Sequence, residues 1–135
     1  MTAGNFSSDL AFQRLRELRP ILLKLHKALL EAERESYEQA NGRIRTKGEY
    51  FQLVIGHEWF SWLRPISKFI VQIDEVLMSK QPQPPEKAEE LLQEARDLLQ
   101  TSATGTALRE RYHVAVQHHP SIAAMHAKVS ELIEE

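Results

Sequence analysis

The chain contains no cysteine, which excludes disulfides, thiolate catalysis, iron–sulfur ligation and zinc sites built on cysteine. Only 5 of its 135 residues are glycine and its β-branched runs are short, which favours helix over sheet. No stretch approaches the roughly 18 uninterrupted apolar residues of a membrane-spanning helix. Residues 1–9 are polar and lack the apolar segment of a signal peptide. We therefore expect a cytoplasmic protein with no membrane partner.

An excess of basic charge is also missing. Lysine and arginine number 17 against 19 aspartates and glutamates, so the net charge is −2 with the histidines neutral. A surface that binds nucleic acid needs clustered positive charge, and this balance argues against a nucleic-acid partner. The length suits one domain with a proper core and is too short for two ordinary ones. We predict a single domain over residues 1–135.

Apolar residues recur at helical spacing in two long stretches, residues 8–40 and 46–79. Asn41 and Gly42 supply a stop between them, so we predict an antiparallel hairpin of two helices. A proline-rich linker at 80–85 follows, and then three shorter helices at 86–102, 106–118 and 120–134. The prediction is an all-α helical bundle built on a long kinked hairpin and covered by three shorter helices.

The stretch 46–79 is apolar around about half of its helical circumference, whereas a surface helix needs only a stripe of about 100°. The residues of this wide arc are Phe51, Ile55, Trp59, Trp62, Leu63, Ile66, Phe69, Ile70, Ile73 and Leu77. Such a helix contacts neighbours on two sides, either at the centre of the bundle or at a subunit seam. We predict a homodimer whose candidate interface residues are Phe51, Ile55, Trp59, Trp62 and Ile66.

A short sequence occurs twice, as Leu-Arg-Pro-Ile at 18–21 and again at 63–66. Proline inside a helix removes one hydrogen bond and kinks the helix. In the predicted hairpin, Pro20 and Pro65 lie near the same level, within about 3 Å along the axis. We therefore predict matched kinks that let the two helices bend together, around either a packed core or a ligand.

Three polar residues project from the apolar side of the first predicted helix. Arg19, His26 and Glu33 are seven residues apart and stand among leucines. Buried polar groups need partners, so these three form an internal hydrogen-bonding ladder or lie at a helix–helix boundary where their polar ends reach water. The functional alternative is a polar row in a ligand pocket or a subunit interface. With His57 and Glu58 from the facing helix, they are our candidate residues for binding a small ligand or haem.

The remaining histidines give only partial metal motifs. Glu110 and His113 have the spacing that di-iron carboxylate bundles use, but no second Glu-x-x-His occurs. His118 and His119 lie at a helix end, where a cationic histidine interacts favourably with the helix dipole. We predict no cofactor, and the alternative is a divalent metal or haem held by members of the set Glu110, His113, His119 and His126.

The sequence contains no glycine-rich phosphate loop, nucleophile elbow or His-Glu-x-x-His motif. Because no nucleophile and base can be paired, we assign no catalytic residues and lean toward a protein that is not an enzyme. The leading hypothesis is a non-enzymatic protein-interaction or scaffold module that self-associates through the apolar arc of 46–79. The alternative is a helical bundle that binds a small ligand, haem or a metal between the two long helices.

Overall fold

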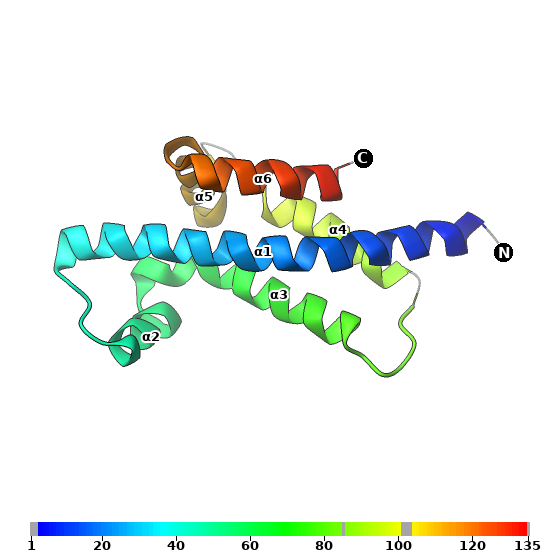
Figure 1. Cartoon of the computed structure of the whole chain (residues 1–135), viewed down its shortest axis with the longest axis horizontal. Helices are drawn as coiled ribbons and strands as arrows, with labels where there is room; N and C mark the ends of the chain where they lie inside the picture. The colour runs from blue at the N-terminus through cyan, green and yellow to red at the C-terminus, as the bar shows by residue number, and fades with distance from the viewer. Residues whose placement is uncertain (1–2, 85, 101–103, 135) are drawn as a thin grey trace.

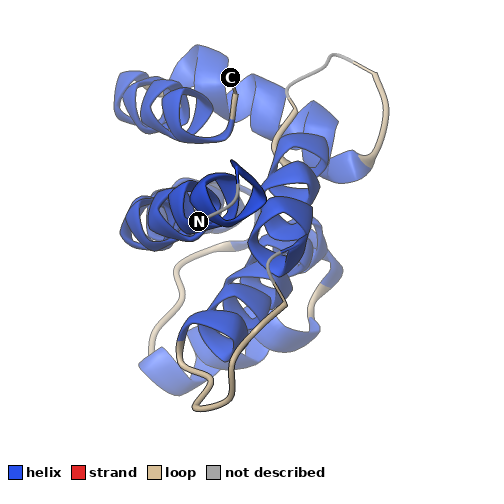
Figure 2. Cartoon of the chain, turned by 90° about the vertical axis from the view of Figure 1, so that its right-hand side faces the viewer, coloured by secondary structure: helices blue, strands red, loops and turns tan. Residues whose placement is uncertain are grey.

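The computed structural model describes residues 3–84, 86–100 and 104–134, with side chains from residue 10 onward. These residues form helices and loops and no strand, so the all-α prediction is confirmed (Figures 1 and 2). In chain order, the elements are α1 (Ala3–Asn41), α2 (Lys47–Gly56), the 3₁₀ helix η1 (Glu58–Leu63), α3 (Arg64–Leu77), α4 (Glu86–Leu98), α5 (Ala107–His118) and α6 (Pro120–Ile133).

Helix α1 is the centre of the molecule. It runs the length of the molecule in Figure 1 and packs against η1, α3, α4 and α6. Five leucines spaced along it are no more than 1% exposed, namely Leu15, Leu18, Leu22, Leu25 and Leu29. Burying one such side chain stabilises the fold by about 1.5–3 kcal/mol. The central helix of this bundle is therefore the first one and not the stretch 46–79.

The predicted single helix over 46–79 is wrong, because the structure divides it into α2, η1 and α3. Helix α2 ends at Gly56, and His57 takes an extended conformation, with φ −86° and ψ 140°. The Nδ1 atom of His57 accepts a hydrogen bond from the Trp59 amide at 3.0 Å and so caps η1. Pro65 occupies the first turn of α3, where its missing amide costs no helical hydrogen bond.

The matched-kink hypothesis fails for the same reason, because Pro65 begins a helix instead of interrupting one. Pro20 does lie inside α1. An ion pair between Arg19 and Asp74 fixes the antiparallel register of α1 and α3. In this register Pro65 is level with about Ala28, roughly 12 Å along the axis from Pro20. The two prolines therefore act separately.

The predicted helix ends are partly confirmed. Thr46 caps α2, accepting a hydrogen bond from the Glu49 amide at 3.0 Å. The chain leaves α1 at Gly42, whose φ of +94° suits glycine, as the predicted stop requires. The start of α1 differs, since it begins at Ala3 and not at Ser8.

The three later helices follow the predicted order, with α4 ending at Leu98 instead of residue 102. Pro85, residues 101–103 and Glu135 lie outside the described residues. Helix α6 covers α1 on the side away from α3, and α5 packs against α6 and η1 (Figure 1). Over the described ranges, no helix is both long and apolar enough to span a membrane.

Candidate functional site

The three polar residues of α1 point to three different places and do not form one ladder. Arg19 forms a salt bridge with Asp74 of α3, and its Nη2 donates a hydrogen bond to Asp74 Oδ2 at 3.4 Å. The hydrogen bond to Asp74 raises the pKa of Arg19, keeping the guanidinium charged. The side chains are 31% and 29% exposed, so this pair ties α1 to α3 near the surface.

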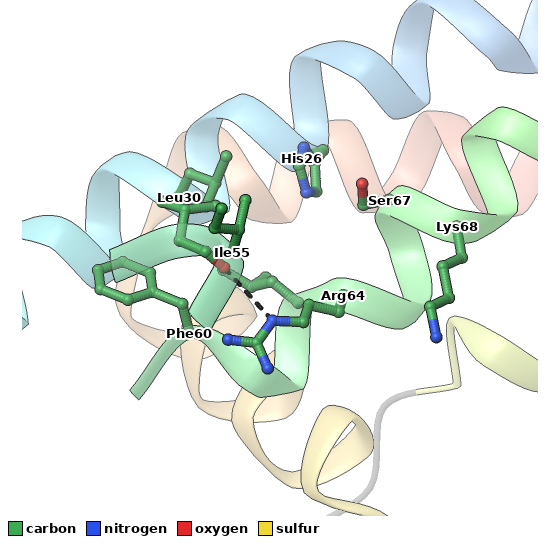
Figure 3. Close-up of a pocket in the computed structure, with 9 residues that line it drawn as sticks. His26, Leu30, Ile55, Phe60, Arg64, Ser67 and Lys68 are labelled. Atoms are coloured by element: carbon green, nitrogen blue, oxygen red, sulfur yellow. Dashed lines mark hydrogen bonds between the residues drawn. The ribbon is translucent and has the colours of Figure 1, made fainter. Parts of the chain in front are cut away.

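His26 lies in a pocket of about 210 Å³ between α1, α2, η1 and α3, which we call the α2 pocket. Figure 3 shows His26 and Leu30 on α1 across from Ser67 on α3, with Ile55, Phe60 and Arg64 beside them, while the Lys68 side chain extends away from α1. The pocket is lined by His26, Leu30, Val54, Ile55, Phe60, Leu63, Arg64, Ser67 and Lys68.

The polar groups of the α2 pocket include two cations and no carboxylate. The Arg64 guanidinium donates to the backbone carbonyl of Val54 at 3.3 Å (Figure 3) and to that of His57 at 2.7 Å. These two bonds hold the end of α2 against α3. Burial lowers the pKa of His26, so this imidazole is neutral near pH 7. The pocket therefore combines an apolar wall with a positively charged rim.

Glu33 lies in a second pocket, of about 230 Å³, which we call the Glu33 pocket. Its lining residues come from α1, η1, α5 and the start of α6, and they are Leu29, Ala32, Glu33, Ser36, Trp62, Arg111, Val114, Ala115, His118 and His119. Glu33 is 8% exposed and is the buried charged residue among those described. Its Oε1 lies 3.9 Å from Arg111 Nη1 and accepts no hydrogen bond.

Burial raises the pKa of Glu33, and this effect outweighs the opposing charge of Arg111. The indole N–H groups of Trp62 and Trp59 also lower the pKa of this carboxyl. Neither indole completes a hydrogen bond, and both Nε1 atoms are buried without a partner. The Glu33 carboxyl is thus surrounded by donors that satisfy it incompletely.

His57 and Glu58, the two remaining ligand candidates, line neither pocket. His57 is exposed and caps η1 through Nδ1, and its ring meets the Tyr37 ring edge-on at 5.6 Å. Glu58 is exposed in the first turn of η1. Both residues lie at the α2–η1 junction, outside the two pockets.

The candidate metal ligands are dispersed. His126 Nδ1 is hydrogen-bonded to the Tyr112 hydroxyl at 2.8 Å, while His119 lies at the start of α6. Glu110 is exposed and His113 is half-buried on α5. Within the part of the chain that the structure describes, no three histidines or carboxylates come close enough to hold one metal ion.

Two of the five candidate interface residues are buried within the single chain. Trp62 and Ile66 are 7% and 0% exposed because they pack inside the chain itself, so neither is available to a partner. Trp59 is half-buried. Phe51 and Ile55 remain, 60% and 51% exposed and one turn apart on α2.

Three cationic residues of the two pockets were not among our candidates. Arg64 and Lys68 are one turn apart and are not part of the predicted apolar arc of 46–79, and the break before α3 brings them to a pocket. Arg111 reaches Glu33 from a helix 78 positions later in the chain, and no local pattern connects the two.

No protein-family model, curated protein or solved structure matches this chain. Its function is therefore inferred from the geometry of these sites.

Proposed function

We propose that this chain is a non-enzymatic protein-interaction module that self-associates through the exposed apolar face of α2. One observation carries the proposal. Five of the ten residues of α2 are apolar or aromatic, yet none of the ten is buried. The core elsewhere buries its apolar residues well, as the leucines of α1 show. Tyr50, Leu53 and Val54 pack partly against the core, whereas Phe51 and Ile55 are exposed and available to a partner.

Phe51 and Ile55 form the centre of this face, because residues four apart lie side by side on a helix. Aromatic and branched anchors of this kind supply most of the binding energy in protein interfaces. A second copy presents the same two residues, so a twofold pairing of α2 with α2 brings the two apolar faces together. The occupant we propose is thus another copy of this chain.

Replacing both anchors tests the proposal. We expect the Phe51→Ser, Ile55→Ser double variant to be monomeric where the natural chain is dimeric, as measured by light scattering at matched concentrations. Loss of two large apolar anchors weakens an interface by about 2–4 kcal/mol or more, which raises the dissociation constant at least about thirtyfold.

The matched control replaces Val71 and Met78, two other exposed apolar residues at 52% and 68%. We expect the Val71→Ser, Met78→Ser variant to remain dimeric. Equal loss of dimer in both variants, or a natural chain that is monomeric throughout, contradicts self-association through α2.

Small-ligand binding is a second candidate function, favoured by the α2 pocket. Its volume of about 210 Å³ lies below the roughly 300 Å³ at which pockets for drug-sized ligands begin. The pocket therefore suits an occupant smaller than haem.

A further inference from the structure

The α2 pocket has a well-formed apolar wall. Phe60 and Leu63 are 0% and 2% exposed. Because both side chains are packed in the core, they form a rigid part of the pocket wall. Leu30 of α1 and Ile55 of α2 also line the pocket, and Figure 3 shows Leu30, Ile55 and Phe60 close together. A cavity of about 150 Å³ is enough to hold a benzene molecule. At about 210 Å³, this pocket holds a ring or a short acyl chain.

Two cationic side chains, Arg64 and Lys68, also line the pocket. Lys68 lies on the exposed face of α3, and among the described residues its ammonium has no hydrogen bond or ion pair. Arg64 bonds only to carbonyl groups, so its charge is not neutralised. Ser67 and the neutral His26 add hydrogen-bonding groups between the two cations and α1 (Figure 3).

The apolar wall and the two cations together determine which class of small molecule the pocket can bind. An apolar wall favours a hydrocarbon body, and two cations without a carboxylate favour a negatively charged head. A cationic ligand meets repulsion at the rim, and a neutral ligand gains only the apolar contacts. We propose that the α2 pocket binds a small amphipathic carboxylate, with its hydrocarbon part against Leu30, Phe60 and Leu63 and its carboxylate at Lys68 and Arg64.

The α2 pocket shares Ile55 with the proposed self-association face, but the two can be tested apart. Phe51 is not among the lining residues of the pocket, and Lys68 is on α3 and not on the face of α2 that pairs. The Phe51→Ser variant therefore loses self-association while it still binds the carboxylate. A chain that dimerises but binds no carboxylate overturns this inference alone.

Octanoate is the probe, with octanamide and octylammonium as matched neutral and cationic compounds. Titration of the natural chain at pH 7.5 and low salt, followed by calorimetry and by amide chemical shifts, measures affinity and location together. We expect saturable octanoate binding with a dissociation constant of about 1 mM or tighter, as ten non-hydrogen atoms allow. The shifted amides should centre on Leu30, Phe60 and Ser67.

The Lys68→Gln variant removes one cation of the rim and leaves the buried wall intact. We expect about fivefold weaker octanoate binding, as loss of one partly exposed ion pair predicts. Lys128→Gln, an exposed lysine on α6, should bind octanoate as the natural chain does. Circular dichroism of each variant verifies that the fold is kept.

Four results overturn the proposal. These are no saturation up to about 10 mM octanoate, octanamide binding as tightly as octanoate, or equal binding by the natural chain and Lys68→Gln. A shift map centred away from the α2 pocket does the same.

Discussion

Glu33 is a carboxyl group that the fold buries without satisfying. Its Oε1 accepts no hydrogen bond, its nearest cation is 3.9 Å away, and that cation is itself on an exposed side chain. A buried acceptor without a partner costs about 1–3 kcal/mol. Because burial raises the pKa of Glu33, the folded chain holds the carboxyl proton more tightly than the unfolded chain does. Its contribution to stability therefore falls as the pH rises from 4.5 through the folded pKa.

Glu33→Gln should stabilise the chain at pH 7 by about 1 kcal/mol, because it removes a buried charge and keeps the shape. The gain should shrink toward pH 4, where the natural carboxyl is itself protonated. Urea unfolding at the two pH values measures the difference. Glu131→Gln on the exposed face of α6 is the control, and it should show no such pH-dependent gain. A loss of stability at pH 7 in Glu33→Gln contradicts this account of the carboxyl.

Tyr112 and His126 form the polar contact between α5 and α6. Tyr112 is fully buried, and its hydroxyl is 2.8 Å from His126 Nδ1, with the two rings edge-on at 5.2 Å. Burial lowers the pKa of His126 and raises that of Tyr112. The lowered pKa of His126 means that its contribution to stability is complete above pH 6.5 and declines as the pH falls below that value.

Tyr112→Phe should destabilise the chain by about 1–2 kcal/mol, because His126 then loses its hydrogen-bond partner at a half-buried position. Thermal unfolding at pH 7.5 measures the loss. Tyr37→Phe is the matched control, since no hydrogen bond of the Tyr37 hydroxyl occurs among the described residues. Equal losses in the two variants would show that the hydroxyl of Tyr112 contributes nothing specific.

The sequence pattern predicted which polar residues of α1 are buried but not which residues they contact. Leucine spacing placed His26 and Glu33 on the inner side of α1, and both are at least half-buried. The partners come from other helices, such as Arg111 of α5, and depend on packing that periodicity does not encode. Residues seven apart also drift slowly around a helix, so Arg19, His26 and Glu33 contact three different sets of neighbours.

At the scale of elements, the break between α2 and α3 is the main departure from the predicted hairpin. The apolar pattern continues in phase through 46–79, which hides the interruption at His57. Gly56 and Pro65 indicate where it falls, because glycine weakens a helix and proline favours the first turn. The two flank η1, in which Phe60, Trp62 and Leu63 turn inward together. Their burial requires the break, since one straight helix cannot direct all of them at α1.

Arg64 is the residue that holds α2 in place, through its bonds to two carbonyls at the end of that helix. In Arg64→Ala we expect amide exchange in α2 to become about tenfold faster, a change of about 1.4 kcal/mol. Exchange in the buried part of α1 should stay unchanged. Arg43→Ala, in the exposed loop before α2, is the control. Uniform acceleration over the whole chain contradicts a local role for Arg64.

At the scale of the whole molecule, the sequence predicts the class of the fold but not its centre. Helical periodicity and the proline linker gave an all-α bundle with helices in the observed order. Both α1 and the stretch 46–79 have broad apolar faces. The sequence does not show which of the two is surrounded by other helices, so it does not identify the central helix. The chain covers α1 with η1, α3, α4 and α6, and leaves Phe51 and Ile55 of α2 at the surface.

The exposed face of α2 makes self-association the central claim about this protein. Sedimentation velocity of the natural chain between about 1 and 100 µM is the most direct test, because it spans the affinities of weak and moderate dimers. We predict a species of twice 15.6 kDa that grows with concentration. A single species of 15.6 kDa at every concentration would contradict the claim and leave the α2 pocket as the functional site to pursue.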